Sequence, residues 1–134
     1  MPFSLCFIGG GNMARSLIGG LLARGTTADD IIVADPFESA RQAVAEQFGV
    51  RTTADNIEAV RTARTVILAV KPQEMRNVTI AIADSLAPEC LIVSVAAGIK
   101  ASDIRRWAKD RAVVRCMPNR PALQGSGMTA LYAT

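Results

Sequence analysis

The stretch Leu5-Cys6-Phe7-Ile8-Gly9-Gly10-Gly11-Asn12-Met13-Ala14 decides the fold, because a short apolar run leads directly into three glycines and the start of a helical pattern. A second apolar run, Ile31-Ile32-Val33-Ala34, closes on Asp35 about twenty residues later. A strand, a glycine turn, a helix and a closing acid at this spacing predict a βαβ unit that binds a dinucleotide. The alternative is a flexible glycine linker, but linkers are not framed by an apolar strand and an amphipathic helix.

Each residue type in the glycine turn has a physical reason. Gly9 lets the chain reverse sharply as it leaves the strand. Gly11 has no Cβ, so backbone N–H groups at the positive end of the helix can approach a pyrophosphate closely. Ala14 occupies the third position of the G-x-G-x-x-A pattern, where a small side chain lets helix and strand pack together.

Apolar runs and amphipathic patterns alternate along the rest of the chain, without an internal repeat. Strands are predicted over residues 5–8, 31–35, 50–53, 66–70, 91–95 and 112–116, with a seventh over 128–133. Helices are predicted over residues 12–24 and 38–48, from Asp55 through Val60, from Met75 to Leu86, and after Ser102. The alternation predicts an α/β fold of the Rossmann type. We expect a doubly wound, mostly parallel sheet in the order 3-2-1-4-5-6, with the seventh strand near its edge and helices on both faces.

Local signals refine the helices. Asp55 followed by Glu58 is a capping-box pattern, and Ser102 is a candidate N-cap for the last helix. The pair Gly19-Gly20 lies inside the first predicted helix, where each glycine costs about 1 kcal/mol in helix propensity. We expect close approach to the sheet or to a cofactor to offset this cost.

The composition is that of one compact domain over residues 1–134, with half of the residues apolar. No apolar stretch reaches the length of a membrane span, and the amino terminus lacks the regions of a signal peptide. We therefore expect a soluble, cytoplasmic protein without a membrane partner. Cys6, Cys90 and Cys116 are far apart and the chain has no histidine, so we expect reduced packing residues and no metal site.

The net charge of the chain is +3. Its one notable basic cluster is formed by Arg105, Arg106, Lys109 and Arg111. Such a cluster can attract an anionic partner, yet the chain has few aromatic residues and no nucleic-acid-binding motif. A solvated helix face is the favoured explanation, and no nucleic-acid partner is expected.

The ligand of a doubly wound sheet lies outside the carboxyl ends of the strands, where the strand order reverses. The loops that the predicted strands deliver there are residues 9–13, 35–36, 70–72, 97–98 and 117–119. They contain no histidine and no paired carboxylates, so no catalytic residue is predicted in them.

These loops and the strands before them resemble, in order, the successive motifs of pyrroline-5-carboxylate reductases. The motifs are Phe7-Ile8-Gly9-Gly10-Gly11-Asn12-Met13-Ala14, Ile67-Leu68-Ala69-Val70-Lys71-Pro72-Gln73, Val93-Ser94-Val95-Ala96-Ala97-Gly98-Ile99 and Val114-Arg115-Cys116-Met117-Pro118-Asn119. The resemblance extends over nearly the whole chain and is far more specific than the glycine pattern alone.

The resemblance implies the last step of proline biosynthesis, in which hydride passes from a reduced nicotinamide cofactor to the imine carbon of 1-pyrroline-5-carboxylate. It also implies an amino-terminal dinucleotide-binding domain followed by a helical domain that forms the dimer and most of the substrate pocket. The chain ends at Thr134. We therefore expect the NAD(P)-binding half alone, inactive in isolation, and a homo-oligomer for the full-length protein.

The resemblance further implies which residues bind the cofactor. Those expected to hold the pyrophosphate are Gly9, Gly11, Asn12 and Met13. Those expected to line the adenosine and nicotinamide ribose side are Val70, Lys71 and Pro72, and those expected near the nicotinamide are Ala97, Gly98 and Asn119. The alternatives are a solvent-exposed strand terminus for Lys71 and a turn former beside Pro118 for Asn119.

Two positions complicate the resemblance. Arg120 stands where the family usually carries threonine, either as a cation beside the nicotinamide pocket or in a surface loop. The second position is Asp35. An acid at the end of the second strand normally accepts hydrogen bonds from the adenosine ribose hydroxyls and favours NAD, whereas the family often uses NADPH. Arg41, one turn into the following helix, can offset repulsion between Asp35 and a 2′-phosphate. We therefore expect the use of both NADP and NAD.

The sequence leaves two other functions open. Another imine or β-hydroxyacid dehydrogenase can share this fold, because fold alone does not determine the substrate. The chain can also be a nucleotide-binding module without turnover, which would bind NAD(P)H yet show no reduction of pyrroline-5-carboxylate.

Overall fold

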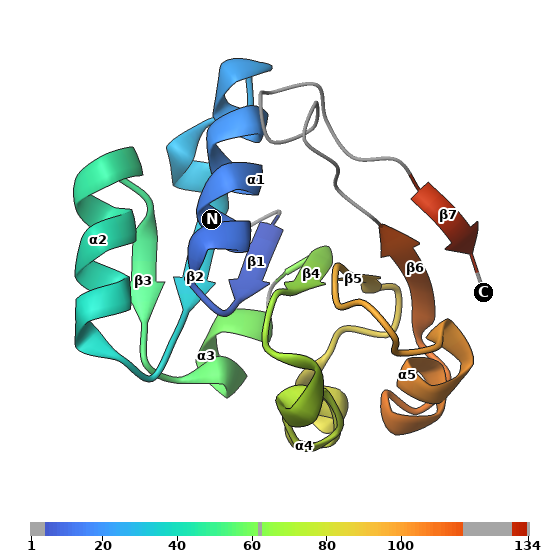
Figure 1. Cartoon of the computed structure of the whole chain (residues 1–134). Helices are drawn as coiled ribbons and strands as arrows, with labels where there is room; N and C mark the ends of the chain where they lie inside the picture. Colours follow the sequence, from blue (N-terminus) through green and yellow to red (C-terminus); the bar gives the residue numbers. More distant parts are fainter. Residues whose placement is uncertain (1–4, 62, 117–129, 134) are drawn as a thin grey trace.

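A computed structural model of the protein describes residues 5–61, 63–116 and 130–133, and its elements alternate as the sequence predicts (Figure 1). The strands are β1 (Leu5–Ile8), β2 (Ile31–Ala34), β3 (Arg51–Thr53), β4 (Thr65–Leu68), β5 (Leu91–Ser94), β6 (Ala112–Cys116) and β7 (Ala130–Ala133). The helices are α1 (Asn12–Ala23), α2 (Glu38–Phe48), α3 (Asn56–Val60), α4 (Pro72–Ile82) and α5 (Ala101–Trp107). Short 3₁₀ turns cover Ala28–Asp30 and Ala83–Ser85.

The described strands form one sheet in the order β3-β2-β1-β4-β5-β6-β7. Strands β1 to β6 pair in parallel, whereas β7 runs antiparallel to β6. The central strand β1 places Leu5 opposite Ile31 of β2 on one side and opposite Thr65 of β4 on the other. The predicted strand order and the added edge strand are confirmed, and the order reverses between β1 and β4.

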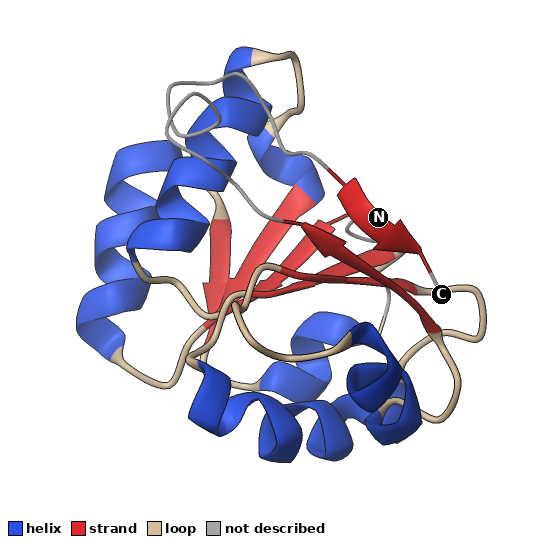
Figure 2. Cartoon of the chain, turned by 45° about the vertical axis from the view of Figure 1, so that its right-hand side comes forward, coloured by secondary structure: helices blue, strands red, loops and turns tan. Residues whose placement is uncertain are grey.

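Helices cover both faces of the sheet (Figure 2). On one face, Phe7 of β1 belongs to an apolar cluster with Ile18 of α1 and Val44 of α2. On the other face, Ile8 belongs to a second apolar cluster with Met75 of α4 and Ile104 of α5. Successive residues of β1 thus point to opposite cores, which explains the uninterrupted apolar run of a strand buried on both sides. Within the described residues, no helix combines the length and apolarity needed to cross a bilayer.

Several predicted boundaries differ from the structure, among them those of β2, β3, β4, β5 and α1, and α4 begins at Pro72 and ends at Ile82 rather than running from Met75 to Leu86. Two of the differences have a clear physical reason. Strand β4 ends at Leu68 because both of its neighbours end at the same level, β1 at Ile8 and β5 at Ser94. Helix α5 begins at Ala101, so the prediction that Ser102 is its N-cap is wrong. The carbonyl of Lys100 already accepts the first helical hydrogen bond, from the amide of Ile104 at 3.2 Å.

The predicted cap of α3 is confirmed on one side only. Asp55 Oδ1 accepts hydrogen bonds from the amides of Ile57, at 2.9 Å, and of Glu58, at 3.3 Å. The reciprocal bond of a capping box is not made, because the amide of Asp55 donates to the hydroxyl of Thr53 instead.

The three cysteines are free and buried, as expected for packing residues. Burial raises the pKa of the Cys6 thiol to about 12 and that of Cys90 to about 11. Both thiols are therefore protonated at neutral pH and lack the thiolate that reactive cysteines require.

The basic cluster is largely neutralised within this domain. Arg106 pairs with Asp103, Arg105 lies 3.8 Å from Asp110, and Lys109 pairs with Asp84. Arg111 donates to the backbone carbonyls of Leu86 and Ala87. These side chains, on α5 and just after it, thus have partners within the domain.

Gly19, the first glycine of the pair in α1, does not approach the sheet as the sequence led us to expect. A Cβ on Gly19 would meet the ring of Phe48 on α2, at 3.5 and 3.8 Å, and no atom of the sheet lies within 4 Å. These are ordinary van der Waals distances, so nothing in the described structure requires glycine at position 19.

We therefore expect Gly19→Ala to stabilise the protein by about 0.5–1 kcal/mol, because alanine loses less conformational entropy in a helix. Urea unfolding would measure the change. Gly49→Ala is the matched control, since Gly49 ends α2 at φ +71° with open space around it. The Gly49→Ala variant should be less stable than the wild type by about 1 kcal/mol, because alanine is strained at this positive φ. A destabilised Gly19→Ala variant would mean that Phe48 cannot accommodate the methyl group.

Candidate functional site

The loops at the carboxyl ends of the central strands converge at one edge of the sheet, because hydrogen bonds continue beyond the strands themselves. The amide of Gly9 donates to the carbonyl of Ala34 at 2.7 Å, and the amide of Ala69 donates to the carbonyl of Ile8 at 2.9 Å. The loops after β1, β2 and β4 are thereby held side by side at the point where the strand order reverses.

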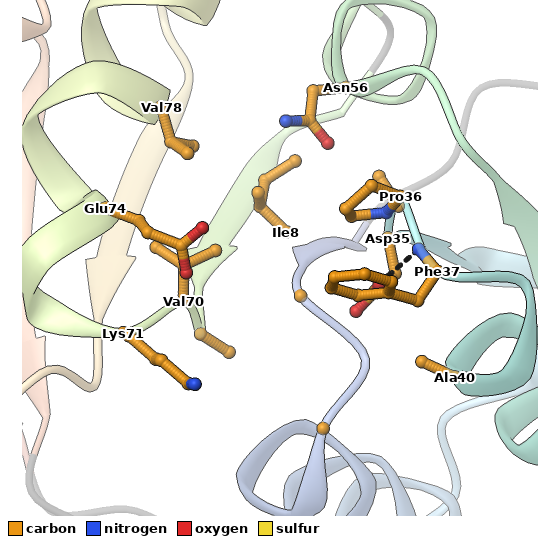
Figure 3. A pocket seen from close by; sticks show the side chains of 14 residues that line it. Ile8, Asp35, Pro36, Phe37, Ala40, Asn56, Val70, Lys71, Glu74 and Val78 are labelled. Atoms are coloured by element: carbon orange, nitrogen blue, oxygen red, sulfur yellow. Dashed lines mark hydrogen bonds between the residues drawn. The ribbon is translucent and has the colours of Figure 1, made fainter.

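A cleft of about 350 Å³ lies over this edge (Figure 3). Its lining comes from the ends of β1 and β2, the glycine turn, the β2–α2 and β4–α4 turns, and residues of α2, α3 and α4. The lining residues are Ile8, Gly9, Gly11, Ala34, Asp35, Pro36, Phe37, Ala40, Asn56, Ala69, Val70, Lys71, Glu74 and Val78.

Gly9 is required by the architecture itself. Its φ is +102°, a conformation that residues with a side chain rarely adopt. A Cβ at this position would lie 2.6 Å from the carbonyl oxygen of Ala69, which belongs to the backbone and cannot move aside. The sharp reversal expected at Gly9 is therefore confirmed.

Gly11 differs, because the protein itself leaves the space beside it empty. Its backbone is extended, with φ −79° and ψ −165°, and any residue can adopt this conformation. A Cβ would meet no atom within 4 Å. The bare backbone of Gly11 therefore keeps open the floor of the cleft at the start of α1.

The amino end of α1 has free capacity to bind an anion. No side chain caps this twelve-residue helix, and its first turn contains no acidic residue. The shorter helix α3, in contrast, is capped by the carboxylate of Asp55. The unsatisfied N–H groups and the positive helix end in the cleft are the arrangement that phosphate groups bind in α/β proteins.

Asp35 is only 8% exposed, and its carboxylate connects two walls of the cleft. Oδ2 accepts a hydrogen bond from the amide of Gly10 at 2.8 Å, and Oδ1 accepts one from the amide of Phe37 at 2.9 Å. Each oxygen retains a second lone pair. The acid expected at the end of β2 is thus present in the cleft with an additional structural role.

Arg41 lies beside this turn but does not pair with the Asp35 carboxylate. Its Nη1 donates to the backbone carbonyl of Asp35 at 2.9 Å and to that of Pro36 at 3.1 Å. The positive charge is therefore held close to the turn after β2, near enough to affect an anion bound there.

Asn56 is a cleft residue that the sequence analysis missed. Its Oδ1 is buried and accepts no hydrogen bond from any described residue. Leaving such an acceptor unsatisfied is costly, so a ligand that brings a hydroxyl or amino donor would be favoured here. The available signal was its position, directly after the Asp55 cap at the carboxyl end of β3.

The opposite wall comes from the β4–α4 turn. Val70 and Lys71 line the cleft as predicted, with Lys71 exposed at the N-cap of α4. Pro72 begins α4 but is not among the lining residues. Glu74 and Val78, which the sequence analysis missed, extend this wall along one face of α4, where their spacing of four residues places them together.

The remaining predicted residues are not brought into the cleft. Asn12 lines a separate, open pocket with Arg15, Ser16 and Gln47, because it starts α1 on the outer side of the turn. Met13 is 37% exposed. Ala97 and Gly98 are exposed in the β5–α5 turn at the same sheet edge, and Asn119 and Arg120 lie outside the described residues. Among the described residues, no group of acidic residues and cysteines is arranged to hold a metal ion.

Comparison with known proteins assigns the family. Residues 4–98 match the family described as NADP oxidoreductase, coenzyme F420-dependent. The chain belongs to this family. Since the match starts just before β1 and ends in the turn after β5, it includes every loop that lines the cleft.

Within this family, the resemblance to pyrroline-5-carboxylate reductases is confirmed. The enzyme of that name from Pseudomonas aeruginosa is 49% identical over 130 residues, which are 96% of this chain and 48% of the relative. The one from Pasteurella multocida is 42% identical over 135 residues, covering 97% of this chain and 49% of the relative. The chain therefore spans about half the length of the curated relatives it matches.

Solved structures support the same resemblance to pyrroline-5-carboxylate reductases. The pyrroline-5-carboxylate reductase of Coxiella burnetii superposes with a TM-score of 0.85 at 36% identity, over 92% of this chain and 47% of that one. The 3-hydroxyisobutyrate dehydrogenase of Mycobacterium tuberculosis gives 0.72 at 19% identity, over 95% of this chain and 44% of that one. The second likeness shows the fold alone, so the comparisons do not favour a β-hydroxyacid dehydrogenase.

The two glycines of the turn give a direct test of the geometry. We expect Gly9→Ala to lose at least about 2 kcal/mol of stability, from backbone strain and from the clash with Ala69. We expect Gly11→Ala to change stability by less than about 0.5 kcal/mol, because its conformation and surroundings accept a methyl group. Unfolding monitored by circular dichroism measures both. Equal losses in the two variants would contradict the described turn.

Proposed function

We propose that this chain is the coenzyme-binding part of a pyrroline-5-carboxylate reductase and that the cleft binds NADP(H) or NAD(H). The observation that carries the proposal is the cleft over the glycine turn in a chain 49% identical to a reductase of that name. The described residues fit a dinucleotide in three respects: the uncapped start of α1, the open space at Gly11 and the unsatisfied Oδ1 of Asn56.

Each wall of the cleft has its own role in this proposal. The amides at the start of α1 bind the pyrophosphate above Gly9 and Gly11, with Asn12 and Met13 beside them. The second lone pairs of Asp35 accept the adenosine ribose hydroxyls, and Asn56 offers a further acceptor nearby.

The rest of the sheet edge serves the other half of the coenzyme. Val70, Lys71 and Pro72 form the side of the adenosine and nicotinamide riboses. Ala97 and Gly98 lie near the nicotinamide, in the turn after β5. Asn119 is outside the described residues, and the resemblance gives it a role near the nicotinamide as well. The site extends in this way across the strands from β2 to β5.

The bound coenzyme supplies the hydride for a C=N bond, here the imine of 1-pyrroline-5-carboxylate, with proline as the product. A protonated imine is already electrophilic, so the chain needs no acid–base pair of its own. Its residues bind and orient the coenzyme and exclude water, and we assign no catalytic residue within this domain.

Residues 1–134 would be the NAD(P)-binding domain of a longer, homo-oligomeric, cytoplasmic enzyme. A helical domain would complete the substrate pocket and the dimer. The isolated chain would then bind the coenzyme without turning over substrate.

Isothermal titration calorimetry is the first test. NADPH and NADH should both bind the wild-type protein. Gly11→Ala should weaken both by at least about tenfold, or 1.4 kcal/mol, because the new methyl group occupies the approach of the pyrophosphate. Gly19→Ala is the matched control, since it adds a methyl group to α1 away from the cleft. Absence of heat with either coenzyme, on folded protein, would overturn the proposal.

Coenzyme choice is tested by Asp35→Ser. Removing the carboxylate removes its repulsion of a 2′-phosphate, while Arg41 remains beside the turn. We expect the ratio of the NADH to the NADPH dissociation constant to rise by about tenfold, because a screened charge pair a few ångströms apart is worth about 1–4 kcal/mol. Both coenzymes use the same glycine turn, so its disturbance cancels in the ratio. An unchanged ratio would remove Asp35 from the discrimination.

A further inference from the structure

Phe37 is the most exposed of the large apolar residues in the described part of the chain, at 70%. Single exposed apolar residues are common on protein surfaces and need no explanation by themselves. Phe37 differs because it lines the cleft, on the side opposite Val70 and Lys71 (Figure 3). Its aromatic surface is therefore presented to the same space as the glycine turn.

The backbone of Phe37 is held on both sides. Its amide donates to Asp35 Oδ1 at 2.9 Å, and its carbonyl accepts from the amide of Arg41 at 3.1 Å as α2 begins. The other oxygen of the same carboxylate holds the amide of Gly10. One side chain thus fixes the backbone from which the ring projects relative to the glycine turn, so the ring is attached at a defined point of the cleft wall.

The surroundings of the ring suit a flat, weakly polar group. The cleft is apolar at Pro36 and Ala40 beside the ring and at Val70 and Val78 on the opposite wall. Aromatic faces stack on nucleobases without requiring specific hydrogen bonds. A dinucleotide carries two such ring systems, the adenine and the nicotinamide.

The location of Phe37 distinguishes between these two rings. It belongs to the turn after β2, two residues beyond the acid that faces the adenosine ribose in folds of this type. The nicotinamide must reach the other side of the switch point, toward β4 and β5, where hydride transfer takes place. The ring that comes within reach of Phe37 is therefore the adenine.

We propose that Phe37 is the stacking platform for the adenine of the coenzyme and thereby determines much of the affinity for the adenosine half. This inference rests on the proposed function, because it assigns a contact within the same cleft. Asp35 then acts partly through Phe37, by holding the turn that presents the ring.

ADP-ribose is the probe, since it contains the adenosine half and the pyrophosphate but no nicotinamide. We expect Phe37→Ala to bind it about 5- to 100-fold more weakly than the wild type, the range for loss of one base–aromatic stack. Phe37→Leu is the matched control for apolar volume and should lose a large part of the same affinity. Phe37→Trp should retain it, and the emission of the introduced tryptophan should be quenched on titration, relative to the wild-type signal from Trp107.

The outcomes separate this inference from the proposed function. If the wild type binds none of ADP-ribose, NADH and NADPH, the proposed function fails. If the wild type binds but Phe37→Ala binds equally well, the stacking inference alone is overturned. It is likewise overturned if Phe37→Ala changes only the sedimentation of the protein, since a second polypeptide would then cover the ring. Bound ADP-ribose without quenching in Phe37→Trp would also contradict it.

Discussion

The close passage of Gly9 past the carbonyl of Ala69 is the constraint on which the rest of the structure depends. Strands β1 and β4 are neighbours in the sheet, so the chain leaving β1 must turn within contact of the chain leaving β4. Only a residue without a side chain can pass there with a positive φ. Once this turn is made, α1 starts immediately, and its uncapped end lies at the floor of the cleft. The glycine turn therefore satisfies a packing requirement as well as a binding requirement.

The second connection is the carboxylate of Asp35. An acid at the end of the second strand is usually discussed for what it does to the ribose, but here its two oxygens also hold the amides of Gly10 and Phe37. The turn after β2 and the glycine turn are thereby joined into one rigid wall. Arg41 holds the same turn through two backbone carbonyls. A charged residue buried at the base of a cleft is tolerated because both oxygens are hydrogen-bonded.

Much of the fold could be predicted from the sequence, because a buried parallel strand and an amphipathic helix have different apolar periods. The strand order followed from the handedness and the alternation of the units. Failures occurred where backbone hydrogen bonding decides: Ser102 is not a cap, since the carbonyl of Lys100 starts the helix one residue earlier. In the cleft, Asn56 was missed because its significance is an unsatisfied acceptor, which no residue pattern reveals. Phe37 was missed because its exposure depends on the turn that Asp35 holds.

The register of the central strand also has a consequence for the order in which the molecule can assemble. Leu5 pairs with Ile31 and with Thr65, so one edge of β1 is completed by a neighbour close in sequence and the other by a segment roughly twice as far away. Pairing segments that are distant in sequence costs more loop-closure entropy, and this cost precedes the stabilising contacts between the strands. During synthesis, the first two strands and their helix can emerge and associate while β4 is still untranslated. The ligand-binding edge therefore cannot form at the ribosome until the fourth strand has left the exit tunnel, although the glycines of its turn are translated well before β4.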